Sequence, residues 1–282
     1  MKKIAVVPTL LTLGNGVCGF AAIACASKIA PNETVAWNDS FFAASGWLVI
    51  AAMVFDMLDG YVARLSKTAS KFGGELDSLC DAVSFGVAPA FLMLKMGPGW
   101  ERSAILHQLL AGIATLYMVC AILRLARFNV DNTPDPAAHK RFRGLPSPGA
   151  AGCLASLAIL RGELPGKLVQ YWSDVEPDAV RQLVQRFVEG FAPLGGLVVA
   201  LLMVSVIPYP HVTKQVLRGR RHLGHLIQVL LVAFIILLVR ELALVLLFWI
   251  YALGVPLRYV ILKNLRPHRD LPAPRLDEPL PR

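Results

Sequence analysis

Charged side chains are scarce in this sequence. Asp, Glu, Lys and Arg make up 17% of its 282 residues, while the hydrophobic residue types make up 56%. Because a soluble globular domain carries about 25% charged residues, this composition argues against one. Acidic residues are rarer than basic ones, because the sequence has 19 Asp and Glu and 28 Lys and Arg. The acids that do occur in apolar stretches are therefore informative.

Cysteine patterns and nucleic-acid-binding patterns are also lacking. The five cysteines fall in apolar stretches, and none forms a CxxC pair or a Cys/His metal-binding spacing. We therefore expect neither a disulfide framework nor a zinc site. The net charge of +9 would suit nucleic acid, but the basic residues gather beside apolar spans and do not alternate with aromatic residues. We expect contact with membrane lipid headgroups and no nucleic-acid partner.

Long apolar runs predict an all-α, polytopic membrane helical bundle. Because about 20 apolar residues in a helix cross a bilayer, the sequence predicts about eight transmembrane helices, a six-helix core plus extra C-terminal helices. They lie at residues 5–27, 41–64, 76–96, 104–127, 147–163, 188–207, 223–239 and 242–262. The fifth is short and the last two are almost continuous, so six or seven crossings also fit.

The basic residues predict the orientation of these helices. With the N-terminus in the cytoplasm, twenty of the 28 Lys and Arg fall on the cytoplasmic side and eight on the other. Positive residues prefer the cytoplasmic side, so we expect a multi-pass protein of the cell membrane with both termini in the cytoplasm. Two lysines, Lys2 and Lys3, precede the first apolar run, as they would in a cleaved secretory signal peptide. We expect instead that this run stays in the protein as its first transmembrane helix.

Four aspartates lie in and beside two of the apolar stretches, namely Asp56, Asp59, Asp77 and Asp81. A charge at the bilayer centre costs about 3 kcal/mol, so such residues are functional by default. We expect a helix that ends near Leu65, a polar loop over residues 66–74, and a second helix that opens at Glu75. Residues three or four apart share a helix face, and a short loop usually joins antiparallel neighbours. The two acid pairs would then face each other and hold two divalent cations, Mg²⁺ or Mn²⁺.

Small and basic residues accompany the acids. Gly60, Ala63 and Arg64 share the face of the first acid pair, and Gly73 lies in the loop. A glycine lets a phosphate or sugar approach the backbone, and an arginine fork suits a phosphate oxygen. The alternative is that these charges form a solvated surface or a buried ion-pair network.

The first apolar stretch carries two polar residues, Thr12 and Asn15, about one turn apart. Polar side chains within a membrane helix usually face the bundle interior. We expect these two to contact either a substrate or a neighbouring helix.

The whole pattern DxxDGxxARx8GxxxDxxxD, from Asp56 to Asp81, resembles the signature of the CDP-alcohol phosphotransferase family. The resemblance implies a membrane-embedded transferase that binds a CDP-linked lipid or alcohol and two divalent metals, and that releases CMP. It implies metal binding by all four aspartates, with Asp81 also serving as the general base. Gly60, Ala63, Arg64 and Gly73 would line the pocket for the CDP moiety.

A second segment carries Arg124, Arg127 and Arg143, which are candidates for binding an acceptor carboxylate or a lipid phosphate. The stretches RLARFN, FRGLPSP and MVSVIPYP look like those of the phosphatidylserine synthase branch of this family. That resemblance implies transfer of the phosphatidyl group of CDP-diacylglycerol to the hydroxyl of L-serine, at an active site facing the cytoplasm. It also implies a homodimer.

Two other functions also fit the sequence. Another member of the same family would use glycerol phosphate or inositol phosphate as the acceptor, which would require more cationic contacts. A cation or proton transporter would also use intramembrane aspartates, but transporters usually contain repeated halves, and the aspartate motif occurs once. We expect a catalytic membrane domain over residues 1–210, further transmembrane helices over 211–262 and a cytoplasmic tail over 263–282.

Overall fold

The computed structural model describes residues 6–66, 70–97, 104–131, 144–171, 176–209 and 240–264. These residues are almost entirely helical. The helices are α1 (Val6–Ser27), α2 (Val35–Leu65), α3 (Lys71–Asp81), the π-helix η1 (Ala82–Val87), α4 (Ala88–Met96), α5 (Ala104–Asp131), α6 (Ser147–Tyr171), α7 (Pro177–Val204) and α10 (Arg240–Asn264). The predicted all-α class is confirmed.

Six stretches in the described residues are long and apolar enough to cross a membrane. They are Val6–Ser27, Val35–Leu65, Phe72–Met96, Ala104–Val130, Asp178–Val204 and Arg240–Tyr259. The predicted fifth span corresponds to α6, which is helical but is not one of these six. The predicted span at 223–239 and most of the predicted tail lie outside the described residues. The chain is therefore a multi-pass membrane protein.

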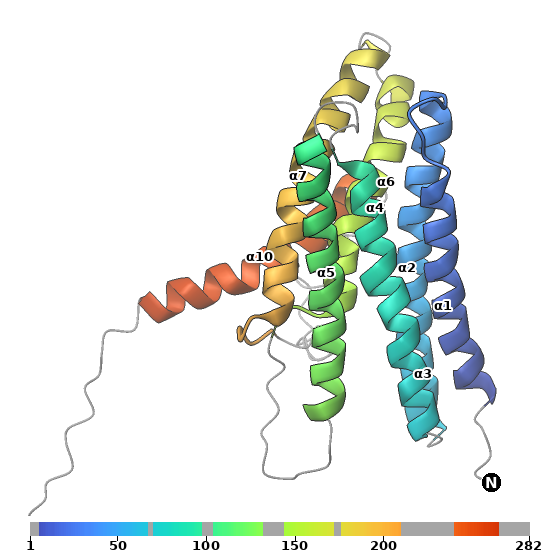
Figure 1. Ribbon diagram of the computed structural model, residues 1–282, viewed down its shortest axis with the longest axis vertical. Coiled ribbons are helices and arrows are strands. Elements are labelled where there is room, and N and C mark those ends of the chain that lie inside the picture. Colours follow the sequence, from blue (N-terminus) through green and yellow to red (C-terminus); the bar gives the residue numbers. More distant parts are fainter. Residues whose placement is uncertain are drawn as a thin grey trace, which may run out of the picture.

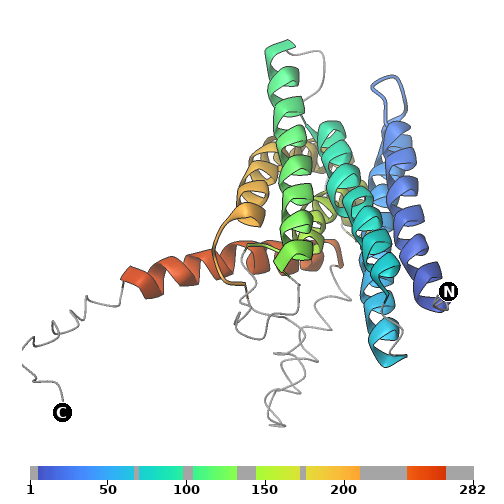
Figure 2. The same ribbon diagram turned by 60° about the horizontal axis from the view of Figure 1, so that its bottom comes forward.

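The helices form an elongated bundle that α10 crosses. Helices α1, α2, α5, α6 and α7 and the continuous α3–α4 unit run along the long axis (Figure 1). Helix α10 lies across them and extends to one side, as both Figure 1 and Figure 2 show. Its outer half therefore leaves the bundle, while its first half packs against α6.

Helix α6 forms the centre of the bundle. Every residue from Ala150 to Leu160 is buried, and many of them are small or apolar. Small residues let neighbouring membrane helices approach one another closely. Here α2, α4, α7 and α10 pack around it. The short span predicted at 147–163 is thus the core helix, and it continues to Tyr171.

A glycine fixes where α6 begins. Gly144 has φ of +89°, a conformation that side chains other than glycine rarely adopt. Its N–H donates to Ile207 O at 2.9 Å, and the N–H of Leu145 donates to Leu202 O at 2.9 Å. A Cβ at residue 144 would collide with the Met203 carbonyl oxygen. The start of α6 is therefore tied by its backbone to the end of α7.

The predicted start of the second aspartate helix is wrong by four residues. Helix α2 does end at Leu65, but α3 begins at Lys71 and not at Glu75. The reason is a cap, because the Ser70 hydroxyl accepts the Gly73 N–H at 3.0 Å, which satisfies one of the free N–H groups of the first turn. The predicted span at 76–96 lies within one continuous helical stretch, Phe72–Met96, in which the π-helix η1 separates α3 from α4.

Candidate active site

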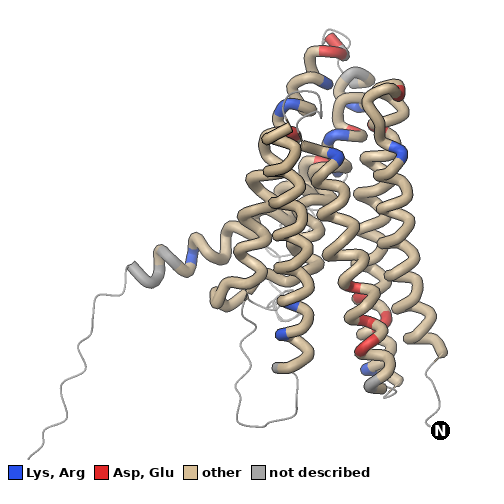
Figure 3. Tube along the Cα trace, viewed as in Figure 1, with Lys and Arg blue, Asp and Glu red and all other residues tan. Residues whose placement is uncertain are grey.

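Three aspartates from two helices converge near one end of the bundle. Asp56 and Asp59 lie on α2, and Asp77 lies on α3. One carboxylate oxygen from each lies within 4.8 Å of the other two. Figure 3 shows the acidic residues of these helices at the lower end of the bundle, at about the level of the basic residues of α5.

Two of these carboxylates have oxygens without a partner. Oδ2 of Asp59 and Oδ1 of Asp77 are buried and accept no hydrogen bond from the described residues. Burying an unpaired charge is costly, and neighbouring carboxylates repel each other. A cation bound between the oxygens would offset both costs. The donor set therefore fits a hard divalent ion such as Mg²⁺ or Mn²⁺.

Asp81 lies one turn beyond Asp77 and outside this group of three. It is 8% exposed, and its Oδ1 accepts a hydrogen bond of 2.8 Å from Nδ2 of Asn15 on α1. The same carboxylate interacts electrostatically with Asp56, Asp77 and Asp59. The structure thus places Asp81 next to the group of three but anchors it to a different helix.

Close packing of small residues brings α1 to this position. A Cβ at Gly16 would lie 2.9 Å from Sγ of Cys80, and one at Gly19 would collide with Ser84. The Ser84 hydroxyl, in η1, donates to the backbone oxygen of Asn15 at 2.9 Å. Helix α1 can therefore approach α3 and η1 closely enough for Asn15 to reach Asp81.

The two polar residues of α1 face the bundle interior, as predicted. Thr12 is 4% exposed and Asn15 is fully buried. The Thr12 hydroxyl donates to the Pro8 carbonyl oxygen at 3.0 Å, and Thr12 also interacts with Asp59. Oδ1 of Asn15 is buried without a partner among the described residues.

The residues predicted to line a nucleotide pocket lie in the last turns of α2, next to Asp59, and in the first turn of α3, four residues before Asp77. Gly60 and Ala63 are partly buried, and Arg64 is exposed. A Cβ at Gly60 would lie 3.4 Å from Nη1 of Arg64, so the guanidinium folds back over this glycine. Gly73 lies in the first turn of α3 and not in a loop. This part of the site thus combines the side-chain-free backbone of Gly60 with the exposed guanidinium of Arg64.

The three predicted arginines differ in their surroundings. Nη1 of Arg124, on α5, donates to the buried Ser147 hydroxyl of α6 at 2.8 Å, and its Nε is buried without a partner among the described residues. Arg127 is exposed on α5. Arg143 lies outside the described residues. The guanidinium of Arg124 lies within electrostatic range of Asp81 and Asp56.

A further contact joins α5 to the acidic helices. Nδ2 of Asn129 donates to the Ser78 hydroxyl of α3 at 2.8 Å. Neither Ser78 nor Ser147 was predicted as part of the site, although Ser147 belongs to the FRGLPSP stretch. Each takes part in a side-chain contact between two different helices.

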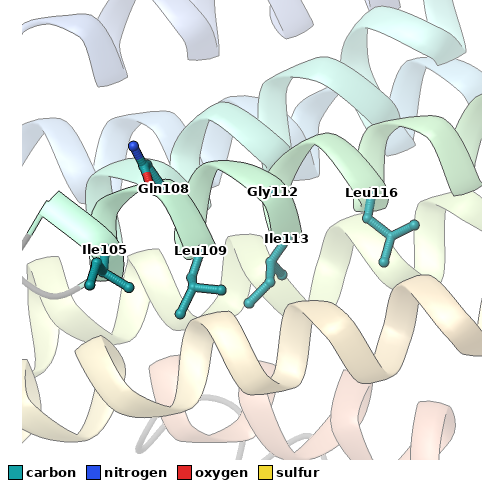
Figure 4. Close-up of a pocket in the computed structure, with 6 residues that line it drawn as sticks. All are labelled: Ile105, Gln108, Leu109, Gly112, Ile113 and Leu116. Atoms are coloured by element: carbon teal, nitrogen blue, oxygen red, sulfur yellow. The ribbon is translucent and has the colours of Figure 1, made fainter.

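An apolar depression on α5 lies away from the acids. Figure 4 shows most of its apolar side chains on one side of the helix. It is lined by Ile105, Gln108, Leu109, Gly112, Ile113 and Leu116. These residues belong to the first half of α5, whereas Arg124 lies in its second half. Their chemistry suits an acyl chain better than a nucleotide.

Comparisons with known proteins agree with this arrangement. A sequence model of the family described as CDP-alcohol phosphatidyltransferase matches residues 5–176. This segment contains all four aspartates, Asn15, Arg124 and Ser147.

Several curated relatives are named CDP-diacylglycerol–serine O-phosphatidyltransferase. The protein of Helicobacter pylori strain J99 is 35% identical over 175 residues, which cover 61% of this chain and 63% of that protein. The Mycobacterium bovis protein is 35% identical over 163 residues, covering 56% of this chain and 51% of the relative. The Methanocaldococcus jannaschii protein is 42% identical over 113 residues, covering 40% and 49%. The chain thus spans about half to just under two thirds of the length of these relatives.

Proposed function

Because the chain belongs to the CDP-alcohol phosphatidyltransferase family, we propose that it transfers the phosphatidyl group of CDP-diacylglycerol to the hydroxyl of L-serine, giving phosphatidylserine and CMP. The observation that carries this proposal is the convergence of Asp56, Asp59 and Asp77 within the matched segment. The names of the relatives in bacteria and an archaeon support serine as the acceptor.

Asp56, Asp59, Asp77 and Asp81 would hold two divalent cations, Mg²⁺ or Mn²⁺. When bound, such ions neutralise the diphosphate and stabilise the attacking and leaving oxygens. The unpartnered oxygens of Asp59 and Asp77 support this assignment.

Asp81 would act as the general base. In the proposed step, the serine hydroxyl oxygen forms a bond to the lipid-linked phosphorus, the bond from that phosphorus to the CMP oxygen breaks, and the hydroxyl proton passes to Asp81. The hydrogen bond from Asn15 leaves the second oxygen of Asp81 for this proton. Its burial keeps bulk water away from the carboxylate.

The remaining predicted residues would bind the substrates. Gly60, Ala63, Arg64 and Gly73 would hold the CDP moiety at the ends of α2 and α3. Arg124, Arg127 and Arg143 are candidates for the serine carboxylate or the lipid phosphate. Of these, Arg124 has the strongest support, because its buried Nε lacks a partner and its guanidinium interacts with Asp81.

The site would open to the cytoplasm, with both termini on that side. The excess of Lys and Arg beside one set of span ends supports this orientation. We also propose that the protein forms a homodimer, which light scattering of the purified protein in detergent would test. The catalytic domain would cover residues 1–210.

A single assay tests the proposed reaction. Purified full-length protein is incubated with CDP-diacylglycerol, Mg²⁺ or Mn²⁺, and either labelled serine or labelled glycerol 3-phosphate. We expect CMP release and labelled lipid with serine alone, and no CMP release from Asp81→Asn. Labelled lipid from glycerol 3-phosphate instead would assign the chain to another activity of the same family. CMP release retained in Asp81→Asn would remove Asp81 from the catalytic residues.

A further inference from the structure

Helix α10 lies beyond the segment matched by the family, yet it packs tightly on the core. The match ends at residue 176, and α10 spans Arg240–Asn264. A Cβ at Gly152 of α6 would collide with the Phe248 ring, and one at Gly195 of α7 would collide with Trp249. Nε1 of Trp249 also donates to the Cys153 carbonyl oxygen at 3.2 Å. These contacts fix the first half of α10 against α6 and α7.

A charged cluster fixes the start of the same helix. Glu241 is fully buried and forms ion pairs with Lys167 of α6 and with Arg240. Arg240 also pairs with Glu163 of α6, whose other oxygen accepts Nε1 of Trp47 on α2 at 2.6 Å. Two acids and two bases thus balance one another. The position of α10 along α6 is therefore set by both charge and close packing.

This placement brings Tyr251 to the start of α6. A Cβ at Gly149 would lie 3.3 Å from the Tyr251 ring, so the ring occupies the space that a larger residue would fill. The ring of Tyr209 lies edge-on at a centroid distance of 5.7 Å, and the Tyr209 hydroxyl donates to Ala252 O at 2.8 Å. The Tyr251 ring is consequently held on two sides.

The same turn of α6 carries the partner of Arg124. Ser147, two residues before Gly149, is fully buried and accepts the hydrogen bond from Arg124. The Arg124 guanidinium lies within electrostatic range of both Tyr251 and Asp81, and its Nε is buried with no partner in the described part of the chain. A buried N–H donor of a charged group is costly to leave unsatisfied. This donor is therefore suited to an anionic oxygen of a ligand.

We infer that Tyr251 of α10 forms, with Arg124 and Ser147, the subsite that binds the anionic group of the acceptor, so that α10 completes the active site. Under the proposed function, on which this inference rests, that group is the serine carboxylate. The Arg124 Nε–H and the Tyr251 hydroxyl would each donate to a carboxylate oxygen, while Ser147 fixes the guanidinium. The acceptor hydroxyl would then lie on the Asp81 side of Arg124.

The test compares Tyr251→Phe with the wild-type chain. The variant keeps the ring against Gly149 and removes only the hydroxyl. We expect the KM for serine to rise about tenfold, as for loss of one hydrogen bond to a charged group, while kcat and the KM for CDP-diacylglycerol change less than twofold. Tyr259→Phe is the matched control, because Tyr259 is an exposed tyrosine of the same helix, and it should leave all three values unchanged.

The outcomes separate this inference from the proposed function. An unchanged serine KM in Tyr251→Phe, or a loss of kcat without a change in that KM, would overturn the inference while the wild-type reaction stands. If the wild-type chain uses glycerol 3-phosphate and not serine, the proposed acceptor is wrong. The same comparison is then made with glycerol 3-phosphate, whose anionic group would occupy the same donors, and an unchanged KM for it would overturn the inference.

Discussion

Replacing Asn15 with alanine should slow the chemical step and leave substrate binding intact. Nδ2 of Asn15 donates to Oδ1 of Asp81 at 2.8 Å, and both residues are buried. A hydrogen bond to a charged group contributes about 1.5–3 kcal/mol. Since each 1.36 kcal/mol corresponds to about a tenfold change in rate, we expect kcat to fall about 10- to 100-fold if the bond holds Asp81 in its reactive position.

The assay is serine-dependent CMP release at saturating CDP-diacylglycerol and serine, with the KM values measured separately. Both KM values should stay within about twofold, because Asn15 is not one of the proposed substrate-binding residues. Ser27→Ala is the matched control, since Ser27 is exposed on the same helix and its hydroxyl donates to the Ala24 carbonyl oxygen of that helix. A wild-type kcat in Asn15→Ala, alongside an inactive Asp81→Asn, would refute the reasoning.

Three further predictions concern the metal site, the core helix and the acceptor subsite. Both Asp77→Asn and treatment of the wild type with EDTA should abolish CMP release. Added Mg²⁺ or Mn²⁺ should restore activity to the EDTA-treated wild type but not to Asp77→Asn. Activity that survives chelation would exclude a metal-dependent reaction. Gly144→Ala should lower the free energy of unfolding by at least about 1–2 kcal/mol, the cost of a left-handed backbone for a residue with a side chain, and an unchanged thermal unfolding temperature in detergent would contradict this. Ser147→Ala should raise the KM for serine about fivefold, as for loss of a hydrogen bond of about 1 kcal/mol, and a KM equal to that of the wild type would show that Ser147 does not position Arg124.

Local sequence patterns predict much of this fold. Apolar length predicts the long helices, and the end of α2 at Leu65 follows from the polar residues after it. The inward orientation of Thr12 and Asn15 follows from the cost of polar groups in lipid. Each of these conclusions depends on neighbouring residues within one helix.

Contacts between distant helices could not be predicted in this way. Asn15 and Asp81 are 66 residues apart, and their hydrogen bond depends on how α1 is rotated against α3. The start of α3 at Lys71 depends on the Ser70 cap, a local signal that the sequence contains but that the apolar pattern obscures. The sequence alone does not distinguish Tyr251 from other tyrosines in apolar helices. Its place near Arg124 depends on how α10 packs on α6.

The π-helix η1 has a consequence for the geometry around Asp81. It begins directly after Asp81 and contains Ser84, and such wide turns arise when one extra residue enters an α-helix. Each residue advances an α-helix by about 100°. Deleting Ala82 or Val83 would therefore rotate Ser84 by about 100° around the helix axis, away from α1. The positions of Asp77 and Asp81 relative to each other would not change. The extra residue in η1 thus changes the rotation of the helix after Asp81. As a result, a single continuous helix places Asp77 and Asp81 beside the other acids and, one turn later, directs the Ser84 hydroxyl toward α1.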